Sequence, residues 1–271
     1  MLMAAYLATA FVVAGVAAGY LLKQRFVPMA RPMLALALAL AMIVPLAPLQ
    51  IVIGDAAALV VRDLQPAKPA AMEAQWATEV MPLRLFAWPD PAQRRNHFEI
   101  GIPKLGSLIT QHSLDAPVKG LLEFPAADRP NAAVLFWSFR LMVGIGFLMV
   151  AVALAAAVLG LRKKVYGSRW FLHTVKWVSP LGFVAIVAGW YTAEIGRQPY
   201  VVYGLLRTAD AVSPVAAGHV VLSLVLFFVV YSAVFGAGFW YLARALRAGP
   251  VEVALPAAPT LGHRPLAGAA P

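Results

Sequence analysis

Five long apolar stretches constrain the fold of this chain more than any other feature of its sequence. They cover residues 3–22, 33–53, 134–161, 178–191 and 215–242. A helix needs about 20 mostly apolar residues to cross about 30 Å of hydrocarbon, and we expect the short fourth stretch to reach that length with residues 171–177 or with the polar residues after it. Hydrophobic residues make up 62% of the chain, against roughly 45–50% in soluble domains. We therefore predict an all-α polytopic membrane protein with about five transmembrane helices.

The charges of the chain predict the orientation of these helices. If the first helix runs inward, the inner segments contain one acid, Glu252, and half of the 22 basic residues. These basic residues are Lys23, Arg25, Arg31, Arg162, Lys163, Lys164, Arg169, Lys176, Arg244, Arg247 and Arg264. They account for the whole net charge of +10, because the basic and acidic residues of the outer segments balance. An excess of Lys and Arg on one side is the positive-inside pattern of membrane proteins, so the charge predicts topology and not a nucleic-acid partner.

Residues 189–214, GWYTAEIGRQPYVVYGLLRTADAVSP, place charges beside segments that are otherwise apolar. An Arg or Asp at the centre of a membrane helix costs roughly 2.5–3.5 kcal/mol, so such residues usually serve a function. Trp190, Glu194 and Arg197 are spaced i, i+4 and i+7, which puts them on one face of a helix. That face offers a carboxylate to a metal and a guanidinium to an acidic group. The chain has no cysteine, which excludes thiolate metal sites, iron–sulfur clusters and c-type haem attachment.

Three segments resemble subunit I of the cytochrome bd quinol oxidases. Residues 189–214 match the family's pattern of GW, Glu, GRQPW and LRT-DA-SP, with Tyr200 where Trp is more usual. VLFWSFRLMVGIGFLMV, which starts at Val134, is similar to the family's FW-FR-MVG motif. DLQPAKPAAMEAQWATE, which starts at Asp63, resembles the start of the family's quinol-binding loop, in its short, cyanide-insensitive form. The resemblance implies a bacterial inner-membrane enzyme that oxidises a quinol at a periplasmic loop and passes electrons through haems to oxygen.

The resemblance implies haem b558, haem b595 and haem d, or a third b haem in place of haem d. Met142 takes the place of the family's second axial ligand to the low-spin haem, and Glu194 takes that of a ligand to a high-spin haem at the oxygen-reducing, catalytic site. Gly146, one turn beyond Met142, leaves room for a flat macrocycle. A methionine in an apolar helix is more often a packing residue, and Glu194 can instead form an ion pair with Arg197.

The resemblance extends the expected cofactor-binding set to four further residues, Trp190, Arg197, Arg207 and Arg140. Arg140 is expected to offset the charge of a haem propionate or to tune the haem potential; the alternative is a side chain that snorkels to the outer interface. Arg207 either contacts a propionate or pairs with Asp210, three residues later. We interpret His219, in the last apolar stretch, as an interfacial histidine and not as a haem ligand.

Lys68 and Glu73 take the places of the family's quinol-interacting lysine and glutamate. A carboxylate accepts protons from a hydroquinone, and a lysine hydrogen-bonds its oxygen; without the resemblance, the two residues are interpreted as a solvated pair. On a short helix that starts after Pro69, Glu73 and Trp76 share a face. Four other residues of this loop are interpreted as solvent-facing or interfacial: Arg94, Arg95, His97 and His112.

The expected organisation has four parts. These are two transmembrane helices in residues 1–53, an outer quinol-binding-type loop in residues 54–131, three transmembrane helices with the haem-site motifs in residues 132–247, and a disordered Pro/Ala/Gly-rich tail in residues 248–271. A loop as long as residues 54–131 is uncommon in a compact protein and suggests a function.

The resemblance also leads us to expect that the sequence covers the C-terminal part of such a subunit, from a truncated or mis-started reading frame. The expected partners are the N-terminal part of subunit I, subunit II, a small single-helix subunit, quinol and membrane lipid. Two other hypotheses stay open. One is a non-catalytic haem- or quinone-binding membrane fragment, and the other is a transporter in which Glu194, Arg197 and Asp210 line a substrate path.

Overall fold

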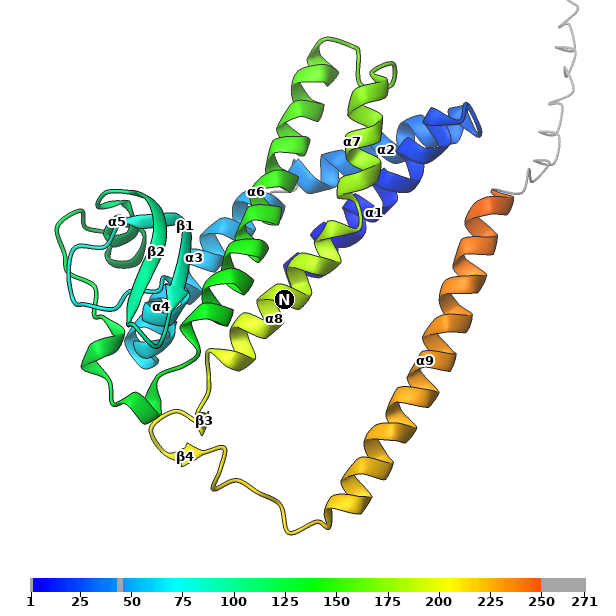
Figure 1. The fold of residues 1–271 in the computed structure, drawn as a ribbon. Coiled ribbons are helices and arrows are strands. Elements are labelled where there is room, and N and C mark those ends of the chain that lie inside the picture. The colour runs from blue at the N-terminus through cyan, green and yellow to red at the C-terminus, as the bar shows by residue number, and fades with distance from the viewer. Residues whose placement is uncertain (1, 43–45, 250–271) are drawn as a thin grey trace, which may run out of the picture. The chain divides into compact units, whose positions relative to one another are not determined.

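The chain divides into two units, Met1–Ala216 and Ala217–Pro271 (Figure 1). A computed structural model describes residues 2–42 and 46–249. The described part of the second unit is one helix, α9 (Ala217–Ala248), in which no residue is buried. A helix that is apolar on all its faces is typical of a membrane span. The expected disordered tail lies, from residue 250 onward, outside the described residues.

Four helical segments of the described residues are long and apolar enough to cross a membrane. They are Leu2–Leu22, Ala126–Leu161, Arg169–Ile195 and Ala217–Ala248. The third consists of α7 (Arg169–Val178) and α8 (Leu181–Ile195), separated at Pro180, because proline lacks the N–H that would continue the helix. The short fourth stretch, residues 178–191, is lengthened by residues 171–177 before it and by residues 192–195 after it, the two extensions that the sequence offered. The all-α polytopic fold is also confirmed in its main features.

The second expected span differs from the structure. Helix α2 (Val27–Met42) has 16 residues, and α3 (Leu46–Leu64) continues well past residue 53, where the span was expected to end. Residues 43–45, between these helices, lie outside the described residues. The described residues therefore contain four continuous candidate spans and one shorter apolar helix in the region of the second expected span. After Gly54, the sequence DAAALVV of residues 55–61 contains neither a proline nor a further glycine that would end the helix.

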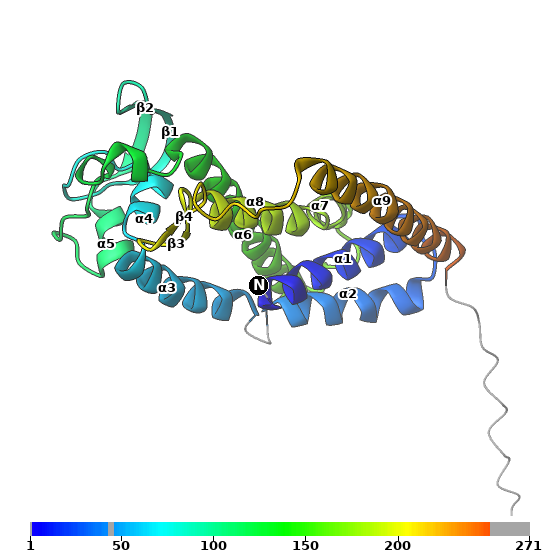
Figure 2. The ribbon, with the colours of Figure 1, turned by 90° about the horizontal axis from the view of Figure 1, so that it is seen from below.

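Small residues allow the helices of the first unit to pack closely. Helix α1 (Leu2–Leu22) lies beside α2 and also contacts α7 and α8 (Figure 2). A Cβ added at Gly15 would meet the Ser179 side chain at 2.3 Å, and one added at Gly182 would meet the Ala8 Cβ at 2.9 Å. Close approach through small side chains is the usual way in which membrane helices associate.

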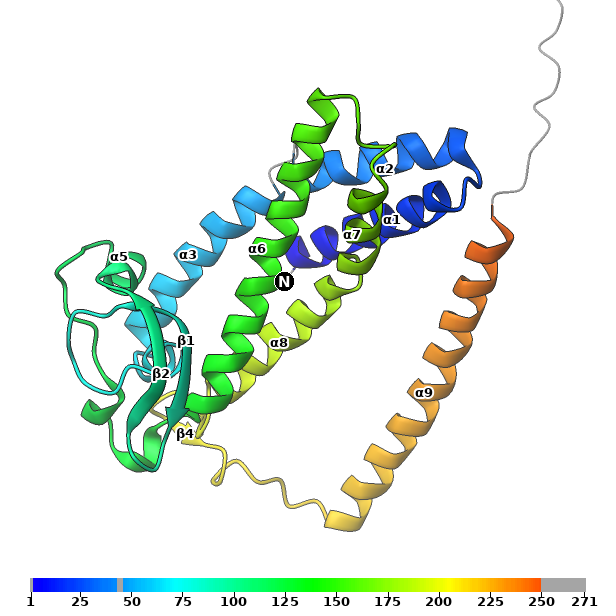
Figure 3. The same ribbon diagram turned by 45° about the horizontal axis from the view of Figure 1, so that its top comes forward.

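The segment between α3 and α6 (Ala132–Leu161) is folded. It contains α4 (Ala67–Met72), strands β1 (Leu83–Asp90) and β2 (Arg95–Ile102), α5 (Leu105–Gln111) and the 3-10 turns η1 (Leu121–Glu123) and η2 (Ala126–Asp128). We call residues 65–131 the outer segment. The two strands pair antiparallel as a hairpin, which lies with α4 and α5 at the end of α6 where that helix begins (Figure 3). A second short hairpin, β3 (Tyr200–Val202) with β4 (Leu206–Arg207), follows α8.

We predict that Gly182→Leu loosens the contact between α1 and α8. The new side chain would overlap the Ala8 backbone, and overpacking of this kind costs about 1–3 kcal/mol. Gly144→Leu is the matched control, because a Cβ at Gly144 on α6 meets nothing within 4 Å. Thermal unfolding of both variants in detergent measures the difference. Equal losses in the two variants would contradict this packing.

Candidate functional site

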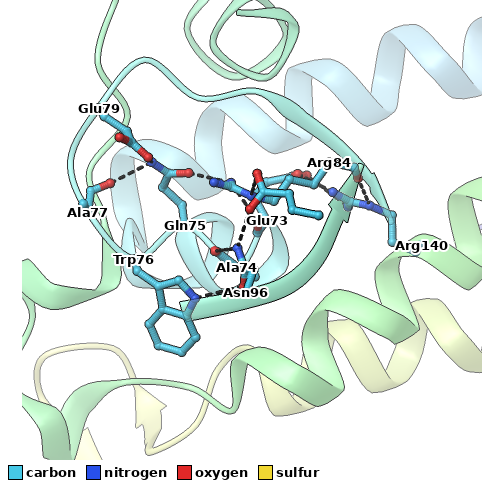
Figure 4. Close-up of polar contacts among 10 residues, drawn as sticks. Glu73, Ala74, Gln75, Trp76, Ala77, Glu79, Arg84, Asn96 and Arg140 are labelled. Carbon is cyan, nitrogen blue, oxygen red and sulfur yellow. Dashed lines mark hydrogen bonds and ion pairs between the residues drawn. The ribbon is translucent and has the colours of Figure 1, made fainter. Parts of the chain in front are cut away.

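A buried ion pair joins the outer segment to helix α6. Glu73 is the residue at the C-terminal cap of α4, and Arg140 lies in the third turn of α6. The Arg140 Nη2 is 2.5 Å from the Glu73 Oε2, and its Nη1 is 3.3 Å from the Oε1, so the guanidinium binds both carboxylate oxygens (Figure 4). The side chains are only 14% and 10% exposed. Such bidentate pairing fixes the orientation of both groups.

Three other contacts hold Arg140 in this place. Its Nε donates to the backbone oxygen of Arg84 at 2.7 Å. Its guanidinium also lies over the ring of Phe136, 4.5 Å from the centroid, and over the ring of Phe139 at 5.6 Å. A guanidinium over an aromatic face is a favourable contact. Both interpretations of Arg140, a partner of a haem propionate and a side chain that snorkels to the outer interface, stay predictions.

Lys68, at the start of α4, reaches the end of α8. Its Nζ donates to the backbone oxygen of Ala193 at 3.4 Å. Gly196 makes room for the chain of this lysine, since a Cβ there would lie 2.7 Å from the Lys68 Cε. Burial lowers the pKa of Lys68, the charge of Arg197 lowers it further, and the charge of Glu194 partly opposes both effects. Lys68 and Glu73 are therefore not a solvated pair, because each contacts a different membrane helix.

Helix α4 thus connects α6 and α8. Its Ala70 and Ala71 are fully buried against Ala132 and Leu135 of α6, and Ile195 of α8 packs on the same cluster. Helices α6 and α8 also contact each other directly, through a hydroxyl pair of Ser138 and Thr192 at 2.9 Å. Helix α4 and its cap residue consequently fix one polar side chain at each of the two helices that carry the sequence-predicted haem ligands, Lys68 at α8 and Glu73 at α6.

Met142 and Glu194 lie on these two helices. The Met142 side chain is partly buried and turned toward α8, because a Cβ at Gly189 would meet its Sδ at 2.8 Å. Gly146, one turn beyond Met142, has open space where a Cβ would be. Glu194 pairs with Arg197, and both side chains are about 40% exposed. This pair is the alternative that the sequence left open for Glu194, and it does not exclude a ligand role.

The remaining expected cofactor-binding residues lie near the same helix end. Trp190 is half-exposed on α8, with its ring edge against Tyr191. Arg207 pairs with Asp128 at 2.5 Å and not with Asp210, which only donates its backbone N–H to the Arg207 oxygen. The expected shared helical face is only partly formed, because α8 ends at Ile195, before Arg197.

Several expectations for the outer segment need correction. Glu73 and Trp76 do not share a helical face, because α4 ends at Met72 and Ala74 adopts the left-handed conformation. Trp76 instead donates its Nε1–H to Asn96 at 2.9 Å. The four residues expected at the surface are where the sequence placed them: Arg94, Arg95 and His112 are exposed, and His97 is partly exposed. The two histidines each lie beside a carboxylate, His97 beside Asp90 and His112 beside Asp55.

Sequence reasoning missed Arg84, which contacts both members of the Glu73–Arg140 pair (Figure 4). It also missed Gln75 and Glu99, which both accept hydrogen bonds from Arg84. Arg84 and Gln75 are buried, and Glu99 is partly exposed. The signal for a hairpin was the pair of aromatic- and aliphatic-containing segments LRLFAWPD and RNHFEIGI on either side of the turn PAQR. Arg84 occupies an inward position in the first of these strands, and a buried charge in a strand requires a partner.

The model of the family described as "Cytochrome bd terminal oxidase subunit I" matches residues 1–250. The chain belongs to the cytochrome bd subunit I family. It is 30% identical to the cytochrome bd-II ubiquinol oxidase subunit 1 of Escherichia coli (strain K12), over 92% of this chain and 61% of that protein. It is 36% identical to the cytochrome bd ubiquinol oxidase subunit 1 of Bacillus subtilis (strain 168), over 82% of this chain and 50% of that protein.

A solved structure agrees with this cytochrome bd membership. The bd oxidase from Geobacillus thermodenitrificans aligns with a TM-score of 0.80 and 34% identity, over 92% of this chain and 57% of that chain. The chain thus spans 50–61% of the length of the curated relatives named above. Together with the apolar helices, the family identifies a bacterial membrane protein.

The donor groups of this cytochrome bd chain fit a porphyrin iron better than a bare metal ion. The described residues contain no group of three or more His, Cys, Asp or Glu side chains that could hold a metal ion alone. Met142 offers one thioether and Glu194 one carboxylate. A porphyrin supplies four ligands itself and needs only such single axial donors from the protein. The open space at Gly146 fits a flat group beside α6.

We predict that Glu73→Leu and Arg140→Leu each destabilise the protein by about 3–5 kcal/mol, because each leaves the other charge buried and unpaired. The double variant should lose less than either single one, since no unpaired charge remains. Arg197→Leu is the control: its pair with Glu194 is partly exposed, and the expected loss is below about 1 kcal/mol. Denaturant unfolding of the four variants in detergent gives the coupling. Additive single losses would contradict a buried, coupled pair.

Proposed function

We propose that this chain provides the quinol-oxidising segment and two haem-ligand positions of a cytochrome bd-type quinol:oxygen oxidoreductase. One observation carries the proposal. The short helix α4 places Lys68 at the end of α8 and Glu73 against Arg140 of α6. Residues assigned to the quinol by resemblance are therefore in direct contact with the helices that carry Met142 and Glu194. The family membership supports the same conclusion.

In this proposal the outer segment removes protons from the quinol. The Glu73 carboxylate is the acceptor for a proton of the substrate hydroxyl, and the Lys68 ammonium donates a hydrogen bond to a substrate oxygen. Arg140 keeps the Glu73 carboxylate oriented, because it binds both of its oxygens. The protons are released on the periplasmic side, where we place the outer segment on the basis of the positive-inside pattern.

The proposed haem positions follow from the donor chemistry. Bound haem would supply the one-electron redox chemistry that links quinol oxidation to oxygen reduction. Met142 would hold a low-spin haem b558, because a thioether is a suitable ligand for its iron. Glu194 would hold a high-spin haem, b595 or d, and Arg197, Arg207 and Trp190 would help to bind it. Arg140 would offset propionate charge of the first haem.

The assembly would include more than this chain. We propose as partners subunit II, a small single-helix subunit, the remainder of subunit I and the lipid of the bacterial inner membrane. The exposed apolar faces of α6 and α9 are surfaces for such contacts. The two rival hypotheses make other predictions: a transporter has no haem absorbance, and a non-catalytic fragment has haem absorbance without quinol oxidation.

We predict that Met142→Leu removes the low-spin haem signal from the redox difference spectrum. Leucine keeps the volume but has no thioether to bind iron. Met149→Leu is the matched control, because Met149 lies on the same helix and is buried in the apolar core. Glu194→Gln should instead remove a high-spin signal and leave the low-spin signal intact. A normal low-spin spectrum in Met142→Leu would disprove this ligand assignment.

We predict that Lys68 sets the alkaline limit of quinol oxidation. Because burial and Arg197 lower its pKa, the ammonium loses its proton at a lower pH than an ordinary lysine, and the rate falls there. Lys68→Arg keeps its charge at every accessible pH, so the alkaline fall should move upward by at least one pH unit or disappear. Lys119→Arg, at an exposed lysine of the same segment, should leave the pH profile unchanged. An identical alkaline limb in Lys68→Arg and the wild type would refute this role.

A further inference from the structure

We propose that Arg84 is a positioning residue that fixes the geometry of the Glu73–Arg140 pair; this inference rests on the proposed role of Glu73 at the quinol. Arg84 lies in strand β1 and is 5% exposed. It donates a hydrogen bond to the backbone oxygen of Glu73 and accepts one from Arg140 with its own carbonyl, so it contacts both members of the pair (Figure 4).

The burial of Arg84 requires a partner for its charge. The Arg84 Nε donates to the Glu99 Oε1 at 2.8 Å, from the neighbouring strand β2. The cluster therefore contains two guanidinium groups and two carboxylates, Arg84 with Glu99 and Arg140 with Glu73. Because each guanidinium has a carboxylate of its own, Arg84 does not compete with Arg140 for the Glu73 carboxylate. The other N–H groups of Arg84 are available for Glu73 and Gln75.

Those N–H groups hold the chain on both sides of Ala74. The Arg84 Nη1 donates to the Glu73 backbone oxygen at 3.3 Å and to the Gln75 Oε1 at 2.6 Å. Ala74 itself has φ of 48°, in the left-handed region that is unfavourable for alanine. Asn96 adds a bond from its Nδ2 to the Ala74 oxygen at 3.0 Å. The turn that aims Glu73 at Arg140 is thus kept in a strained conformation by side chains of the hairpin.

Gln75 is held in the orientation that Arg84 requires. Its Nε2 donates to the Ala77 oxygen at 2.7 Å and to the Glu79 Oε1 at 3.3 Å, which leaves its Oε1 to accept from Arg84. On the other side, the Arg84 carbonyl accepts from the Arg140 Nε at 2.7 Å. Arg84 therefore positions the Glu73 carboxylate by holding the turn after it, and positions the Arg140 guanidinium with its own backbone carbonyl.

The test uses the assembled oxidase that contains this chain, with a short-chain ubiquinol as substrate. Arg84→Met should raise the KM or lower the kcat about tenfold, with an unchanged haem spectrum. Arg84→Lys should show a similar loss, because lysine keeps the charge but cannot donate to Glu99, the Glu73 carbonyl and Gln75 in a fixed fork. Arg129→Met is the matched control. Arg129 also donates to backbone oxygens of the outer segment, those of Phe124 and Leu122, but contacts neither Glu73 nor Arg140.

A double variant separates positioning from general damage. If Arg84 acts through Glu73, then Arg84→Met in a Glu73→Gln background should be no slower than Glu73→Gln alone. Glu99→Gln, at a partly exposed residue, is a milder second variant and should cause a smaller loss in the same direction. Wild-type kinetics in Arg84→Met, or a full tenfold loss that persists in the Glu73→Gln background, would overturn the inference.

Failure of the proposed function would give a different result. If Glu73→Gln oxidised the quinol at the wild-type rate, the quinol role of Glu73 would be wrong, whatever Arg84 does. Hydrogen exchange then tests the positioning by itself. Arg84→Met should speed amide exchange in residues 73–76 at least tenfold, whereas Arg129→Met should not. Unchanged exchange in Arg84→Met would overturn the inference independently of any activity.

Discussion

The pairing of Glu73 with Arg140 is the interaction on which the arrangement of this chain depends. Arg140 belongs to a long apolar helix, where an unpaired charge is costly. Its partner comes from the outer segment, more than sixty residues earlier in the chain. The outer segment is consequently held on α6 by the need to neutralise a charge that the helix itself carries. Phe136 of α6 is also buried with Ala74 and Ala87 of the outer segment, and this apolar cluster adds to the anchor.

The close packing of the helices makes this anchor rigid. Gly182 brings α8 against α1, and the hydroxyls of Ser138 and Thr192 join α6 to α8. Helix α4 then joins this helix pair. Lys68, its second residue, contacts α8, and Glu73, its C-terminal cap, contacts α6. A shift of either helix would therefore be transmitted to Lys68 or Glu73, which links the proposed quinol site mechanically to the proposed haem positions.

The sequence predicted the membrane class, the spans at residues 3–22, 134–161 and 215–242, and the extension of the short stretch by residues 171–177, because apolar length is a local property. It did not predict that α3 would continue to Leu64 or that the outer segment would contain a hairpin. The sequence also did not predict which residues the charged side chains pair with. Arg207 meets Asp128 and not Asp210, because the folded outer segment brings a distant carboxylate nearer than the local one.

Lys68 and Glu73 show why the residues of the site could be predicted from the sequence but their spatial arrangement could not. They are five residues apart and appear to form one local pair, yet the cap of α4 and the left-handed Ala74 turn them to different helices. Arg84 and Asn96 of the hairpin both donate hydrogen bonds to backbone oxygens of this turn. The geometry of Glu73 is thus determined by residues that come later in the chain. A quinol bound between Lys68 and Glu73 would contact both α8 and α6, so the strain at Ala74 would be part of what aligns the substrate with the helices that carry Met142 and Glu194.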